Sequence, residues 1–254
     1  MNPKGSKIRG SSAGAQSEIS EASPTNIAYE GNYTLSLTSG SGAPASLQAP
    51  GWAVLQILPS EKYTMTGMLA DGTPSTAGGP TGGLGLGLPL MIPIAISFDK
   101  GHATLGGELT LNPAASLTEP APCGDGFGTL QWVKQNATGG FSETLGPTIS
   151  QYAPAPAAAL LSSSSCTLTI GSGSPIKFTI NSRGAAIFPP ATPGSPKLSF
   201  TPATGAFSGS FTPIGGHSTS FSGVILPNTA AGSGFILIDG SATPVSIAPA
   251  AVSD

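Results

Sequence analysis

Short runs in which apolar and polar residues alternate recur along the chain from residue 31 onward. A period of two places one set of side chains against a core and the other towards water, which indicates β-strands. Gly and Pro residues separate these runs, and roughly fifteen strands at such spacings are typical of sandwiches and barrels. We therefore expect an all-β fold, an antiparallel barrel or sandwich of many short strands. The clearest runs are residues 33–37, 53–58, 63–69, 92–98, 103–111, 128–133, 166–170, 176–180, 197–201, 206–211, 219–226, 234–238 and 245–247.

A glycine phrase recurs inside these runs: a β-branched or aromatic residue, a glycine, one spacer residue and then a large apolar residue. Its copies lie at residues 66–69, 105–109, 207–211 and 221–226. Glycine weakens a strand interior unless the chain bends there or another backbone passes close by. The phrase thus predicts antiparallel strands with glycines at bends or tight crossings.

The composition of the chain changes at two places. Residues 1–28 contain Ser, Ala, Gly and isolated charges without periodicity, which predicts a flexible leader or linker. Residues 153–165 are rich in Pro, Ala and Ser. We therefore expect a first β half at residues 29–152, a connection at 153–165 and a second β half at 166–250, related as two halves of one architecture.

Charge is scarce in this chain, with 9 basic and 12 acidic residues, or 8% charged, against roughly 25% in an average domain. Solubility must come from hydroxyl and amide groups, a surface more typical of extracellular modules than of cytosolic enzymes. Scattered basic residues argue against nucleic acid as a partner, because phosphate binding needs clustered cations. No transmembrane segment is expected, because glycines and prolines break the densest apolar run, residues 84–98.

Five segments carry a resemblance to a known group of domains. They are residues 31–34, 69–73, 128–132, 204–211 and 221–226, the last together with residues 234–235. In this order they resemble a β-rich domain near the C-termini of large exported bacterial surface proteins, often downstream of immunoglobulin-like or fibronectin-like repeats. The resemblance covers about residues 31–250 and implies an extracellular, periplasmic or cell-surface module with a structural or adhesive role. It brings no established activity and no functional residues, and residues 73–88 form an insertion relative to it.

The two cysteines, Cys123 and Cys166, are 43 positions apart and match neither a zinc site nor a redox pair. A disulfide between them would indicate an oxidising compartment and would add roughly 3 to 4 kcal/mol by the chain-entropy model. Two separate buried thiols are the alternative.

Two surface sites can be proposed from residue types. The glycine-rich segment at residues 78–88 and the apolar residues around it predict a contact surface for a partner protein. Its candidate contact residues are Leu84, Leu86, Leu88, Leu90 and Met91. A rival carbohydrate site would use Trp132 and Phe141 as aromatic platforms beside the carboxylate of Asp125. The other carboxylates include Asp71, which has the sequence context of a turn.

No sequence pattern indicates a catalytic residue, a cofactor or a metal site. Both histidines, His102 and His217, follow glycines at expected turns, so neither is placed as a catalytic base. The favoured hypothesis is a non-enzymatic structural or adhesive module that acts through sheet edges and loops. Residues 92–98 and 245–247 are the candidate edges. Alternatives are a carbohydrate-binding or carbohydrate-active domain and a subunit of a filament or multiprotein complex.

Overall fold

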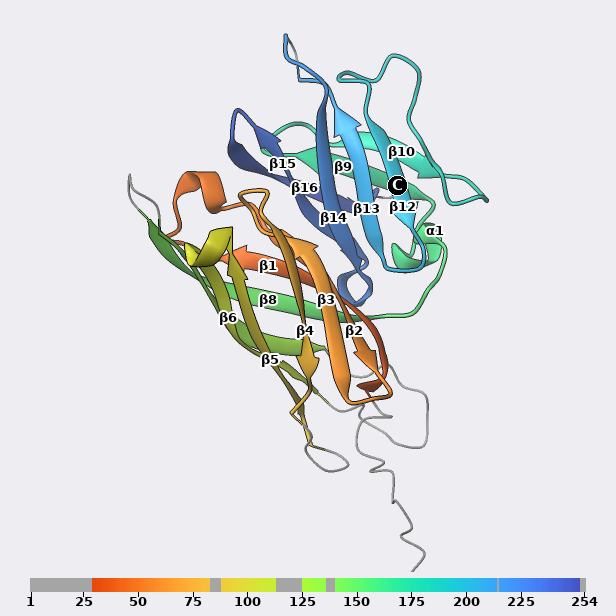
Figure 1. Cartoon of the computed structure of the whole chain (residues 1–254). Helices are drawn as coiled ribbons and strands as arrows, with labels where there is room; N and C mark the ends of the chain where they lie inside the picture. Colours follow the sequence, from red (N-terminus) through yellow and green to blue (C-terminus); the bar gives the residue numbers. More distant parts are fainter. Residues whose placement is uncertain (1–28, 83–87, 113–124, 136–139, 214, 252–254) are drawn as a thin grey trace, which may run out of the picture.

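The chain folds into two stacked β-barrels (Figure 1). A computed structural model describes residues 29–82, 88–112, 125–135, 140–213 and 215–251. Within these residues the strands form two antiparallel sheets of eight strands, and each sheet is nearly closed on itself. The predicted all-β fold with two related halves is confirmed.

The first barrel is an antiparallel meander whose first and last strands pair. Its strand order is β4-β3-β2-β1-β8-β7-β6-β5, so the barrel has a seam between β4 and β5. Its elements are β1 (Gly31–Ser39), η2 (Ala45–Leu47), β2 (Gly51–Leu58), β3 (Lys62–Met68), β4 (Pro74–Pro80), β5 (Leu90–Phe98), η3 (Asp99–Gly101), β6 (Ala103–Leu111), β7 (Gly126–Lys134) and β8 (Phe141–Tyr152).

The second barrel repeats this plan with its seam one strand earlier. Its order is β11-β10-β9-β16-β15-β14-β13-β12, so the seam lies between β11 and β12. A short helix, α1 (Ala157–Leu160), lies in the connection between the two barrels. The other elements are β9 (Ser165–Ile170), β10 (Ile176–Ile180), β11 (Ala186–Ile187), β12 (Lys197–Thr201), β13 (Ala206–Phe211), β14 (Thr219–Leu226), η4 (Pro227–Thr229), β15 (Ala231–Ile238) and β16 (Ser241–Pro249).

Each barrel has its own apolar core, built by the period-two pattern. On β1, Tyr33, Leu35 and Leu37 point into the first core and are almost fully buried. On β14, Phe221 and Ile225 point into the second core. The intervening residues of β1 and β14 face outward, as the alternation requires.

The outward faces of β1, β2 and β8 pack against those of β14 and β15. Hydroxyl groups pair across this interface, for example Ser36 Oγ with Ser233 Oγ at 2.7 Å. The indole N–H of Trp52 donates to Ser222 Oγ at 2.9 Å. Apolar contact accompanies these bonds, because Phe235 of the second barrel is 3% exposed and belongs to the first barrel's core cluster. The two barrels therefore form one packed body.

Tyr152 adds a pH-dependent link between the barrels. Its ring packs against Gly205, and its hydroxyl donates to the Pro202 carbonyl oxygen. Burial raises the pKa of this phenol. The folded state thus favours the neutral phenol, and this contribution to stability is complete below the ordinary pKa of about 10 and is lost as pH rises through the folded-state pKa.

We expect Tyr152→Phe to be less stable than the wild type near neutral pH, because the hydrogen bond to Pro202 is lost. The difference in free energy of unfolding, from urea titrations at a series of pH values, should shrink above about pH 10, where the wild-type phenol ionises. A difference that does not change with pH would contradict the assignment.

Three strands lie where the alternating pattern did not predict them. β4 and β8 contain proline and glycine, and β11 has only two residues. The expected edge at residues 92–98 is found, since β5 is the last strand of its sheet. The expected edge at residues 245–247 is wrong, because β16 pairs with both β9 and β15. Within the described residues, no helix is long and apolar enough to span a membrane.

Candidate functional site

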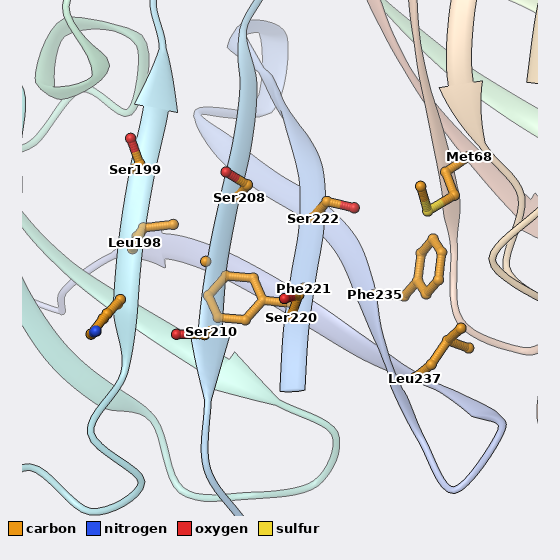
Figure 2. A pocket seen from close by; sticks show the side chains of 12 residues that line it. Met68, Leu198, Ser199, Ser208, Ser210, Ser220, Phe221, Ser222, Phe235 and Leu237 are labelled. Carbon is orange, nitrogen blue, oxygen red and sulfur yellow. The ribbon is translucent and has the colours of Figure 1, made fainter. Parts of the chain in front are cut away.

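A groove runs over the outer face of the second barrel to the place where the barrels meet (Figure 2). We call it the hydroxyl groove. Its volume is about 570 Å³. Strands β12, β13, β14 and β15 form its floor, and the end of β3 forms part of its wall. The residues that line it are Met68, Lys197, Leu198, Ser199, Ser208, Gly209, Ser210, Ser220, Phe221, Ser222, Phe235 and Leu237.

Strand register places the serines of this groove in two rows. Ser199 pairs with Ser208, which pairs with Ser222, so three hydroxyls cross three strands. The second row consists of Lys197, Ser210 and Ser220. Neighbouring strands lie about 4.8 Å apart, so each row is a regular series of hydrogen-bonding groups. Figure 2 shows Ser199, Ser208 and Ser222 side by side on successive strands.

The apolar end of the groove lies against the first barrel. Met68, Phe235 and Leu237 gather there (Figure 2). The hydrogen bond from Trp52 to Ser222 fixes the side chain of the last serine in the first row. This end is thus joined to the first barrel, whereas the opposite end reaches β12, the last strand of the sheet.

The hydroxyl groove is polar and carries a single charged side chain. Serine hydroxyls both donate and accept hydrogen bonds, and Lys197 supplies the one charged side chain among the lining residues. None of these lining residues is a carboxylate or a histidine. The groove can therefore hydrogen-bond a neutral polar surface, but its residues do not form an acid–base pair.

The residues of the rival carbohydrate site do not gather in one cleft. Trp132 is 1% exposed and packs edge-to-face against Phe141, with ring centroids 4.6 Å apart. A side chain buried in this way offers no platform for a sugar ring. Asp125 directly precedes β7, which begins at Gly126. Trp132 lies six residues further along this strand, so its backbone is about 20 Å from that of Gly126 and further still from that of Asp125.

The apolar residues predicted to contact a partner have different environments. Leu84 and Leu86 lie outside the described residues. Leu88 is half exposed, and Met91 is partly buried. Leu90 is 1% exposed and belongs to the first core, so its interpretation as a surface contact was wrong. Its burial follows from the alternation of β5, which directs Leu90, Ile92 and Ile94 inward.

Cys166 lies in the core of the second barrel, and burial raises the pKa of its thiol. Its predicted disulfide partner, Cys123, lies outside the described residues. The bridge therefore stays a prediction.

Asp71 has the predicted role in a turn. Its carboxylate accepts a hydrogen bond from the Thr73 amide N–H at 2.8 Å and also binds Lys134 at 2.7 Å. Among the described residues, no three His, Cys, Asp or Glu side chains gather in a group that could hold a metal ion.

The sequence pattern alone did not predict the serine rows, although it contains one feature that points to them. Serines alternate with core residues in 206–211 and 219–226, the same segments that carry the glycine phrase. Their lateral alignment depends on register, which these two segments do not specify by themselves.

Comparisons of the chain with protein-family models, with curated proteins and with solved structures found no match.

Proposed function

We propose that this chain is a non-enzymatic structural or adhesive module of an exported or cell-surface assembly, and that it contacts another copy of itself through the edge of β12. The packed pair of barrels supplies a rigid unit. The edge of β12, beside the hydroxyl groove, supplies the contact.

The unpaired side of β12 is the observation that carries this proposal. β12 pairs with β13 along five residues, but no strand in the described residues pairs with its other side. Its neighbour across the seam, β11, has two residues and pairs with β10. An edge of this kind presents backbone N–H and C=O groups to which an extended chain can add.

The seam of the first barrel is better closed, which makes β12 the stronger candidate. There the Gly82 N–H donates to the Met91 carbonyl oxygen at 2.8 Å. The hydroxyl of Tyr63 donates to the carbonyl oxygen of Pro93 on β5. Pro93 also lacks an N–H, so β5 is a poor template for strand addition.

The sequence of β12 suits antiparallel pairing with a second copy. A two-fold axis through Ser199 would place Lys197 opposite Thr201 and Leu198 opposite Phe200. The one charged residue of the strand then meets a neutral residue, so the pairing has no like-charge contact. Ile187, which is 50% exposed on β11 at the same seam, provides nearby apolar surface.

Export is supported by sequence features. The chain has few charges and resembles domains of exported bacterial surface proteins. A hydroxyl-rich surface of low charge suits association by backbone pairing, because strand addition brings few like charges together. The carbohydrate alternative has weaker support, since Trp132 is buried and Asp125 is distant from it.

Sedimentation velocity over a wide range of protein concentration tests the proposed contact. We expect the wild type to form a dimer, because pairing about a two-fold axis is closed. Ser199→Lys should weaken the dimer about tenfold or more, because two lysines would face each other across the axis. Mixing Ser199→Lys with Ser199→Glu should restore association, since opposite charges would then meet.

Ser246→Lys is the matched control for this test. Ser246 is also an exposed strand serine, but β16 is paired on both sides, so its substitution should leave the dimer unchanged. A monomeric wild type would contradict the proposal, as would equal effects of the two lysine substitutions. Growth to open-ended polymers would instead support the filament alternative.

A further inference from the structure

The second barrel has a pocket at one open end, distinct from the hydroxyl groove and from the edge of β12. We call it the barrel-mouth pocket. Its volume is about 730 Å³, within the range of roughly 300–1,000 Å³ that holds drug-sized ligands. The residues that line it are Ile170, Gly171, Ser172, Gly173, Ser174, Pro175, Ile176, Lys177, Pro189, Thr192, Pro193, Phe211, Pro213, Ile238 and Thr243.

The pocket lies where strand ends meet. β9, β13 and β15 finish at this end, and β10 begins there. Ile170, Phe211 and Ile238 pack against the second core on one side, yet each of them is only partly buried. The core thus forms an apolar floor, and the mouth above it is open.

Two loops form preformed walls around this floor. The hairpin at residues 171–175 makes one wall. The proline-rich loop at residues 189–196 contributes Pro189, Thr192 and Pro193 to a second wall, and it is held by the bond from the Thr212 N–H to the Gly194 carbonyl oxygen at 2.9 Å. Gly194 lies against the ring of Phe211 with a φ of +76°, so a side chain there would strike the ring. Prolines and this close packing limit the motion of the wall.

The lining chemistry selects a class of ligand. Isoleucines, prolines and Phe211 make most of the surface. The Thr192 hydroxyl donates to the Pro189 carbonyl oxygen at 2.6 Å, so it can accept a hydrogen bond from a ligand, and the Thr243 hydroxyl can orient a polar group. Lys177 is the one charged residue among those that line the pocket. It is followed by the core residue Phe178, so the alternation of β10 directs its side chain away from the barrel interior.

We propose that the barrel-mouth pocket is a binding site for a small, uncharged, mainly apolar molecule. The mouth of a β-barrel is a frequent place for such sites because strand ends leave apolar interior surface without a covering layer. This site is independent of the proposed contact between copies, since it uses none of the groups on the edge of β12.

Fluorescence titration with the neutral dye N-phenyl-1-naphthylamine tests this site. We expect saturable binding of one dye molecule per chain. Ile238→Asn should weaken binding about tenfold or more, because it removes apolar floor. Ile187→Asn is the matched control, as Ile187 is exposed on the same barrel but does not line the pocket; it should leave the affinity unchanged.

Methyl NMR of the wild type avoids dependence on a variant that fails to fold. With labelled isoleucine methyl groups, the dye should shift Ile170, Ile176 and Ile238 and leave Ile57 and Ile187 unchanged. Absence of saturable binding, or shifts confined to the first barrel, would overturn the proposal. Preference for the anionic analogue 1-anilinonaphthalene-8-sulfonate that is lost in Lys177→Gln would overturn the assignment to an uncharged ligand.

Discussion

Gly223→Ala is expected to lower the free energy of unfolding by about 3 kcal/mol, at the upper end of the usual cost of overpacking a core. A Cβ at this position would lie 2.4 Å from Phe207 Cζ and 2.3 Å from the Ser233 carbonyl oxygen. The backbone contact cannot be relieved by a rotamer change, and Phe207 is 1% exposed in the second core. β14 must therefore move away from β15 to relieve the contact with the Ser233 carbonyl oxygen, and the Phe207 ring must shift as well.

Urea unfolding followed by tryptophan fluorescence and circular dichroism measures this effect. Gly40→Ala is the control, because a Cβ at Gly40 meets no atom within 4 Å and its φ is not positive; its effect should stay within about 0.5 kcal/mol. Combining Gly223→Ala with Phe207→Leu should give less than the sum of the two losses, since the smaller side chain relieves one of the two clashes. Equal effects of the two alanine substitutions would contradict the proposed packing.

This result would define the role of the glycine phrase. Gly209 leaves room for the ring of Phe221, and Gly223 and Gly232 leave room for Phe207. In the first barrel, Gly67 permits close approach to the backbone of Trp52 and Ala53. The predicted tight crossings are therefore present, and in the second barrel aromatic rings from other strands of the same sheet occupy the space that side chains at these glycines would take.

Much of the fold could be predicted because it depends on a local pattern. Alternation in residues 53–58 and 63–69 is enough to define two half-buried strands and to place Leu55 and Met65 inside. The strands that the alternating pattern does not predict are determined by pairing with neighbouring strands. β8 contains Gly146-Pro147 and β4 contains Gly78-Gly79-Pro80, yet each strand is held by its neighbours, because tertiary pairing overrides weak propensity.

The candidate sites were harder to predict because they depend on register and closure. Ser199 and Ser222 are 23 positions apart and share one row only because β13 lies between their strands in a particular alignment. The barrel-mouth pocket combines residues from position 170 to position 243. The burial of Trp132 also depends on register. An aromatic residue in an alternating run can face the core or the solvent, and the sequence of its own strand does not decide which until the pairing with neighbouring strands is known.

The contact between the barrels should be tested by Phe235→Ala, which we expect to cost about 3–5 kcal/mol, as for other buried phenylalanines. Phe235 extends from β15 of the second barrel into the core cluster of the first barrel. Its loss should cost more free energy than the loss of either described hydrogen bond across the interface, Ser36–Ser233 or Trp52–Ser222, since a neutral hydrogen bond contributes about 1 kcal/mol. Differential scanning calorimetry of the wild type should show one cooperative transition.

The variant should show two transitions, because each barrel retains its own core after the shared contact is weakened. Phe127→Ala is the matched control, since Phe127 is 58% exposed on the first barrel and its removal should leave the single transition in place. Two transitions in the wild type would show that the barrels are energetically independent. A single, unshifted transition in Phe235→Ala would show that the contact adds nothing to stability, and a rigid two-barrel unit would then lose its physical basis.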